Sequence, residues 1–199
     1  MLKKMTLLAM AVGALIAFAV PAVASAADQW TYEDAAIPNN GSEVVETYEG
    51  LLSFTTPSPP LPVHSTFGCQ VTVAIVATGT ANGTGHAEVV EFNPTTTECS
   101  GTGVFTGCHL IADESNPPWT VDIGATDLTV TGPITIHNTY TSCPAGPESN
   151  LAFNSITAET TSTTAGIQTI HIHGVATNGV TTAFGTVHAE GEGLLGVDY

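Results

Sequence analysis

Closely spaced turn-forming residues divide this chain into short runs of β-branched and aromatic residues. It contains 32 Thr, 20 Gly and 12 Pro among 199 residues, and such a composition favours strands broken by turns. The best candidate for a helix, residues 149–168, is crowded with Thr, which is a poor helix former. We therefore expect an all-β fold, either an antiparallel sandwich or a barrel.

Two Asn-Gly pairs predict hairpins, because Asn-Gly is the strongest short turn signal between strand-like runs. They are Asn82-Gly83 and Asn178-Gly179. A two-residue turn at the second pair fixes the register so that the numbers of facing residues sum to 357. The runs that we expect to form strands cover residues 49–55, 70–78, 85–92, 103–112, 119–123, 127–140, 167–177 and 180–191.

The first 26 residues have the three parts of a secretory signal peptide. Lys3-Lys4 is followed by an apolar stretch, residues 7–20, and by the small residues Ala24-Ser25-Ala26. The stretch of about 14 apolar residues is shorter than the ~20 that a spanning helix needs. We therefore expect residues 1–26 to be cleaved, and the protein to be secreted to the extracellular space or the cell surface with no membrane span.

The expected mature chain reads as one domain. Residues 27–46 include Pro38-Asn39-Asn40-Gly41 and are predicted to be a loose N-terminal arm. Residues 47–199 are predicted to form a single β domain. Such an arm suggests self-association, in which it would add as a strand to the sheet edge of a neighbouring copy.

Both basic residues of the chain, Lys3 and Lys4, lie in the expected leader. The formal net charge of the whole sequence is −16, and cleavage would make it more negative by two. Nucleic-acid binding requires Lys or Arg to displace phosphate counterions, and an Arg clamp on a phosphate or carboxylate is equally excluded. Partners are therefore expected among apolar ligands or cell-surface proteins.

Export makes the cysteines informative, because disulfides persist in oxidising compartments. The chain has an even number of cysteines and no Cys-x-x-Cys motif. We expect two disulfides that staple the β domain, and the sequence leaves all three possible pairings open. The four residues are Cys69, Cys99, Cys108 and Cys143.

No motif marks a catalytic site. Residues 191–196 fit the Gly-x-Gly-x-x-Gly string, but a dinucleotide loop must open a helix, and the chain ends three residues later. The sequence has no Gly-x-Ser-x-Gly and no His-Glu-x-x-His. We expect a protein that is not an enzyme and requires no cofactor.

The histidines near the C-terminus suggest a metal site. In a strand, His171 and His173 lie on one face because side chains alternate with period two. In the predicted register His171 faces Thr186 and His188 faces Thr169, so that the three imidazoles share a face. Such a group is a candidate for Zn²⁺ or Cu²⁺. The alternative is that they are ordinary solvent-facing residues of a sheet.

Landmarks between Cys69 and Cys143 recur in a known family. A cysteine opens a hairpin of alternating Val and Thr, Phe105-Thr106-Gly107-Cys108 follows, and Pro118-Trp119 precedes another strand-like run. This Cys…Gly-x-x-Cys…Pro-Trp pattern resembles the secreted protein activator of alkane oxidation family and its uncharacterised actinobacterial relatives. The resemblance implies a small β domain and an exported, non-enzymatic accessory role in the use of apolar substrates.

Three functions therefore follow as hypotheses. The first is an accessory protein of the cell surface or extracellular space that handles apolar substrates, in which Trp119 is a candidate ligand contact. The second is a divalent-metal-binding β module. The third is a structural protein that assembles by strand addition. For Trp119, a place in the core is the simpler interpretation.

Overall fold

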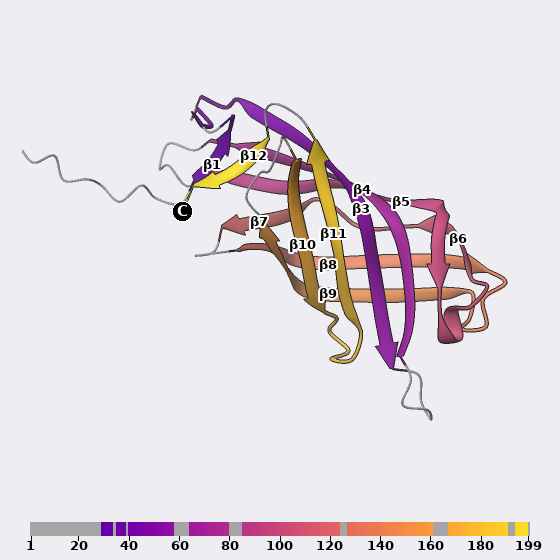
Figure 1. Ribbon diagram of the computed structural model, residues 1–199. Coiled ribbons are helices and arrows are strands. Elements are labelled where there is room, and N and C mark those ends of the chain that lie inside the picture. Colours follow the sequence, from indigo (N-terminus) through magenta and orange to yellow (C-terminus); the bar gives the residue numbers. More distant parts are fainter. Residues whose placement is uncertain are drawn as a thin grey trace, which may run out of the picture.

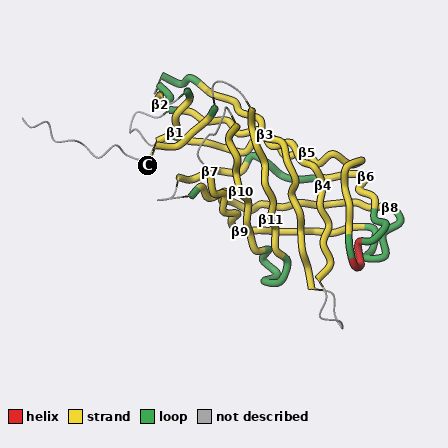
Figure 2. The backbone as a smooth tube through the Cα atoms, in the orientation of Figure 1, coloured by secondary structure: helices red, strands yellow, loops and turns green. Residues whose placement is uncertain are grey.

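The computed structural model describes residues 29–33, 35–38, 40–57, 64–79, 85–123, 127–160, 167–190 and 194–198. The expected signal peptide, residues 1–26, lies outside the described residues. Nearly all of the described backbone is strand (Figure 2), and the described ranges contain no α-helix. The strands are β1 (Gln29–Tyr32), β2 (Ala35–Ala36), β3 (Glu43–Pro57), β4 (His64–Thr78), β5 (His86–Gly101), β6 (His109–Asp113), β7 (Trp119–Ile123), β8 (Leu128–Thr141), β9 (Glu148–Thr160), β10 (Ile167–Val175), β11 (Thr182–Glu190) and β12 (Leu195–Asp198).

Eight of the described strands close into an antiparallel barrel. Their order is β8-β7-β5-β4-β3-β11-β10-β9, and the pairing of β9 with β8 completes the ring. The short β6 pairs with the far end of β8, beyond the part of β8 that pairs with β7. The prediction of an all-β antiparallel fold is confirmed, and of the two predicted forms the barrel is the one observed (Figure 1).

Alternation along the strands determines what fills the barrel. In β3, Tyr48 and Leu52 are buried, whereas Glu49 and Leu51 between them are exposed. β8 repeats the pattern after an irregularity between Thr131 and Ile134, where its pairing with β9 shifts register. Because successive side chains point to opposite faces of a sheet, each strand contributes one apolar row to the interior.

A small sheet of order β12-β1-β2 lies at one end of the barrel, opposite the turn between β10 and β11 (Figure 1). Trp30 and Leu195 of this sheet, and Ile37 directly after β2, are buried and belong to the same apolar cluster as the barrel interior. Gly85, at φ +66°, makes room for this sheet, because a Cβ there would lie 2.9 Å from Trp30 Cδ1.

The prediction of a loose arm over residues 27–46 is wrong for the described part of that segment. Residues 29–32 pair with β12, and residues 43–46 form the beginning of β3 and pair with β4. The polar turn residues around Asn40 gave the segment its loop-like character. Burial of Trp30 and Ile37 against the barrel provides the apolar area that fixes it.

The structure selects one of the three disulfide pairings. Cys69 bonds to Cys99, its direct neighbour across β4 and β5. Cys108 bonds to Cys143 immediately beyond the first β6–β8 residue pair, His109 with Thr141. Both bridges border a second apolar cluster, formed by Phe67, Cys69, Cys108, Leu110 and Tyr140.

Several strand boundaries differ from the sequence prediction. Residues 103–105 form a 3₁₀ turn, and the strand expected over 103–112 begins at His109. Strand β9, residues 148–160, was not predicted. The Thr residues of this segment argued against a helix, but nothing in it was taken as evidence for a strand. The Asn82-Gly83 turn lies outside the described residues, but the β4–β5 pairing that it was expected to connect is present.

The register predicted for the last hairpin is confirmed. His171 pairs with Thr186 and Thr169 pairs with His188. The turn differs in one respect: Ala176 still bonds to Thr181, which leaves a four-residue loop in place of a two-residue turn. Within the described ranges, no helix has the length and apolar character needed to cross a bilayer.

Candidate functional site

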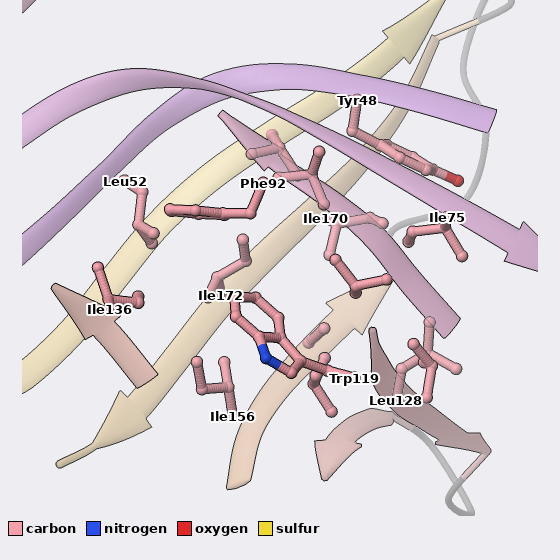
Figure 3. Close-up of a pocket in the computed structure, with 16 residues that line it drawn as sticks. Tyr48, Leu52, Ile75, Phe92, Trp119, Leu128, Ile136, Ile156, Ile170 and Ile172 are labelled. Carbon is pink, nitrogen blue, oxygen red and sulfur yellow. The ribbon is translucent and has the colours of Figure 1, made fainter. Parts of the chain in front are cut away.

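A cavity of about 70 Å³ lies in the barrel interior, and we call it the inner chamber. Its walls come from both halves of the barrel, and the labelled side chains of opposite walls point toward one another (Figure 3). All its lining residues are aliphatic or aromatic: Tyr48, Leu52, Val73, Ile75, Val89, Phe92, Trp119, Val121, Leu128, Val130, Ile136, Ile156, Ala158, Ile170, Ile172 and Val187.

The inner chamber has an energetic cost when it is empty. Residual cavities destabilise a core by about 24 cal/mol per Å³, so a cavity of 70 Å³ costs about 2 kcal/mol. Eight-stranded barrels are just wide enough either to be filled by side chains or to hold one small ligand. An apolar molecule that fills this space would recover the lost contacts and stabilise the fold.

Two further cavities lie next to one another and to the inner chamber. A small one of about 10 Å³, which we call the waist, shares Leu52, Phe92 and Ile136 with it. A larger one of about 180 Å³, the outer chamber, shares Phe54 and Phe67 with the waist. The shared walls place the three spaces in series.

The inward row of β8 shows that this series runs along the barrel. Ile136 lines the inner chamber and the waist, Asn138 lines the waist, and Tyr140 lines the outer chamber. β3 repeats the order, with Leu52 lining the inner chamber and Phe54 the outer one. A strand rises about 3.3 Å per residue, so alternate residues mark successive positions along one path.

Polarity changes along this path. The inner chamber is apolar throughout, whereas the outer chamber is also lined by Thr56, Ser149 and Thr181. The Tyr140 hydroxyl lies 2.9 Å from Ser149 Oγ, and burial raises the pKa of Tyr140. Polar side chains therefore line the series only beyond the inner chamber, and an apolar pocket with a few placed polar groups is typical of a small-molecule site.

Trp119 lies in the wall of the inner chamber, as both a core residue and a contact of the cavity. Its side chain is 5% exposed, and its ring packs against Phe92 at a centroid distance of 5.8 Å. Its Nε1 donates a 3.1 Å hydrogen bond to Asn116 Oδ1. The indole N–H therefore has its hydrogen-bond acceptor outside the chamber, and the apolar part of the ring faces the cavity.

One interior hydrogen bond connects β3 to β10, the next strand but one in the barrel wall. The Tyr48 hydroxyl donates to Gln168 Oε1 at 2.7 Å, and both side chains are buried. Burial raises the pKa of Tyr48, and the nearby Glu46 carboxylate adds to this effect. The phenol thus stays neutral at physiological pH, and its proton remains engaged with Gln168.

Asp113 is a functional candidate that sequence reasoning missed. It is followed by Glu114 and the turn-forming residues 115–118, a setting that indicates a solvated acid. The structure instead places it in the wall of the waist, where its Oδ2 is buried and has no hydrogen-bond partner among the described residues. Burial raises its pKa, which hydrogen bonds from Ser115 and the nearby His137 partly offset.

The three histidines lie on the outward face of the barrel, away from the chambers. His171, His173 and His188 are exposed, and His171 Nδ1 lies 3.2 Å from Thr186 Oγ1. The shared face was predicted correctly. In the described part of the chain, however, no three His, Cys, Asp or Glu side chains lie close enough together to hold a metal ion.

Comparison of the chain with protein-family models, with curated proteins and with solved structures finds no match.

Proposed function

We propose that this protein is an exported, non-enzymatic accessory protein that holds a small apolar molecule inside its barrel. The observation that carries the proposal is the inner chamber, an apolar cavity of about 70 Å³ enclosed by 16 aliphatic and aromatic residues. Its volume corresponds to about five water-sized spaces, which suits a tail of roughly five or six carbons. The proposal agrees with the resemblance to the alkane-oxidation activators.

The two disulfides support export, because such bonds persist in oxidising compartments. The absence of Lys and Arg beyond residue 4 supports an uncharged ligand over a phosphate or carboxylate. Burial of six methylene groups at about 0.8 kcal/mol each provides roughly 5 kcal/mol. This corresponds to a Kd of about 0.3 mM, as befits a protein that collects and releases a solute.

Quenching of Trp119 by 1-bromohexane tests the proposal. Trp119 lines the inner chamber, whereas Trp30 lies toward the small sheet and does not. The Trp30→Phe variant leaves Trp119 as the single tryptophan, and we expect saturable quenching in it that hexane competes away. The matched Trp119→Phe variant should show little saturable quenching. Purely linear quenching in the Trp30→Phe variant, with no competition by hexane, would exclude this function.

A thermal melt of the exported, oxidised protein separates this proposal from the alternatives. Hexane should raise the melting temperature, with hexadecane as a longer-chain comparison. A rise with Zn²⁺ or Cu²⁺ alone, abolished in His171→Ala, would instead favour the metal-binding module. Assembly by arm exchange lacks support, because residues 29–32 and 43–46 already pair within their own chain.

A further inference from the structure

We infer that the preferred ligand is an amphiphile, an aliphatic tail with one uncharged hydroxyl headgroup, and that the Oδ2 of Asp113 at the waist binds the hydroxyl. This inference rests on the proposed function and specifies its ligand class. The tail would occupy the inner chamber, and the hydroxyl the space between the two chambers.

The carboxyl group of Asp113 is only half satisfied. Its Oδ1 accepts a 3.2 Å hydrogen bond from the Ser115 backbone N–H. Its Oδ2 is buried and has no partner among the described residues. A buried polar atom without a partner costs roughly 1–3 kcal/mol, so a ligand group that bonds to Oδ2 gains more here than at a solvated carboxylate.

The position of Asp113 places its side chain in the wall of the waist, beside the proposed path of the ligand. Asp113 pairs across β6 and β8 with Asn138, whose side chain is 3% exposed. Both residues line the waist, together with Leu52 and Ile136 of the inner chamber wall. The waist, at about 10 Å³, has the size of one water molecule, and a hydroxyl group is of that size.

Charge selects the hydroxyl over other headgroups. The titratable groups that interact with Asp113 include the Glu114 carboxylate, the His137 imidazole and the Tyr140 phenol, and the sequence has no Lys or Arg beyond residue 4. A carboxylate headgroup would therefore enter a site with no cation of fixed charge to compensate it. A hydroxyl both donates and accepts, so it can bond to Oδ2 whether Asp113 is ionised or protonated.

The test compares hexan-1-ol, hexane and hexanoate as competitors of 1-bromohexane in the full exported protein. Asp113→Leu removes the carboxyl group with a side chain of similar shape. The matched control, Glu114→Leu, removes the adjacent exposed carboxylate and changes the net charge equally. A hydrogen bond to a charged group contributes enough for a tenfold to hundredfold change in affinity.

We expect the ratio of hexan-1-ol to hexane affinity to fall at least tenfold in Asp113→Leu and to stay within twofold of wild type in Glu114→Leu. Hexanoate should bind more weakly than hexan-1-ol. An unchanged ratio in Asp113→Leu, the result expected if a water molecule occupies the waist, overturns the inference. If hexane still binds, the proposed function stands. Failure of both hexane and hexan-1-ol to bind wild type overturns the proposed function itself.

A measurement on wild type keeps the inference testable if Asp113→Leu does not fold. The ¹³C resonance of the Asp113 carboxyl group should shift on saturation with hexan-1-ol and not on saturation with hexane, because only the alcohol forms a hydrogen bond to it. Equal shifts with both ligands would contradict the assignment of the headgroup to Asp113.

Discussion

Trp119 and Asn116 form a hydrogen bond of 3.1 Å that fixes the orientation of the indole ring in the wall of the inner chamber. The same Asn116 Oδ1 also accepts the backbone N–H of Thr135 at 2.7 Å, and Asn116 Nδ2 donates to the Pro133 carbonyl at 2.8 Å. One amide therefore connects the beginning of β7 to the irregular part of β8.

Replacing this amide should destabilise the barrel. Asn116→Ala leaves the part-buried Trp119 donor without its acceptor, which costs about 1 kcal/mol or more. The bond from the Thr135 N–H is exposed to solvent, so its loss adds little. We expect a loss of roughly 1–2 kcal/mol in the free energy of unfolding, measured by urea denaturation. Asn93→Ala is the control, because Asn93 is exposed and its side chain bonds only to the neighbouring Glu91 among the described contacts; it should cost less than about 0.5 kcal/mol.

Filling the inner chamber should separate stability from binding. Ala158 is 7% exposed and lines the chamber, so Ala158→Leu adds apolar volume where space exists. We expect an unchanged or higher melting temperature and at least a tenfold loss of affinity for hexane. The control Ala145→Leu adds the same atoms at an exposed turn. A variant that keeps full hexane affinity would place the ligand elsewhere.

Stability should decrease as the pH rises through the range in which Asp113 ionises. Burial raises the pKa of Asp113 above its ordinary value of 3.8, so between those two values the folded state binds more protons than the unfolded state. The contribution to stability is therefore complete below pH 3.8 and is lost as the pH rises through the raised pKa. The pKa of Glu46 is also raised by burial, so Glu46 acts in the same direction.

Chemical denaturation measures this loss of stability. It should be carried out between about pH 3.5 and pH 8, roughly the range over which buried acids titrate. Asp113→Asn should flatten the decline in the free energy of unfolding, whereas Glu114→Gln, at an exposed position with the same charge, should change its slope less. Equal slopes in wild type and Asp113→Asn would show that Asp113 does not titrate differently on folding.

Removal of the Cys108–Cys143 bridge should loosen the outer end of the barrel. It closes a loop of 35 residues, for which the chain-entropy model gives a stabilisation of about 4 kcal/mol. The Cys108→Ala/Cys143→Ala double variant should lose up to that amount in non-reducing urea denaturation. It should also lose amide protection around Tyr140, which packs in the adjacent cluster. An unchanged urea midpoint would mean that β6 and the cluster around Tyr140 are stable without the disulfide.

Local features of the fold could be predicted from the sequence. The period-two alternation and the turn residues indicated strands, and Asn178-Gly179 gave the register in which His171 faces Thr186. Strand β9 was missed because residues 148–160 are rich in Ser and Thr and lack strong apolar alternation. The pairing of β1 with β12 could not be predicted, because it joins segments more than 160 residues apart.

The candidate site was predictable only in part. Trp119 was identified as a possible ligand contact, and it lines the inner chamber. The chamber itself has no sequence signature, because each of its residues is an ordinary inward-facing apolar residue of a strand. Asp113 resembled a solvated turn acid, and only the pairing of β6 with β8 brings it beside Asn138.

The sequence by itself determined the class of fold, the direction in which each side chain of a strand points, and a strongly negative net charge. These follow from local chemistry: side-chain alternation, turn geometry and the lack of Lys and Arg. Tertiary structure decided that the sheet closes through β8 and β9, that Cys69 bonds to Cys99, and that a cavity remains inside. Closure depends on the summed twist and register of all the strands, and a cavity is the difference between the volume that they enclose and the volume that their side chains fill.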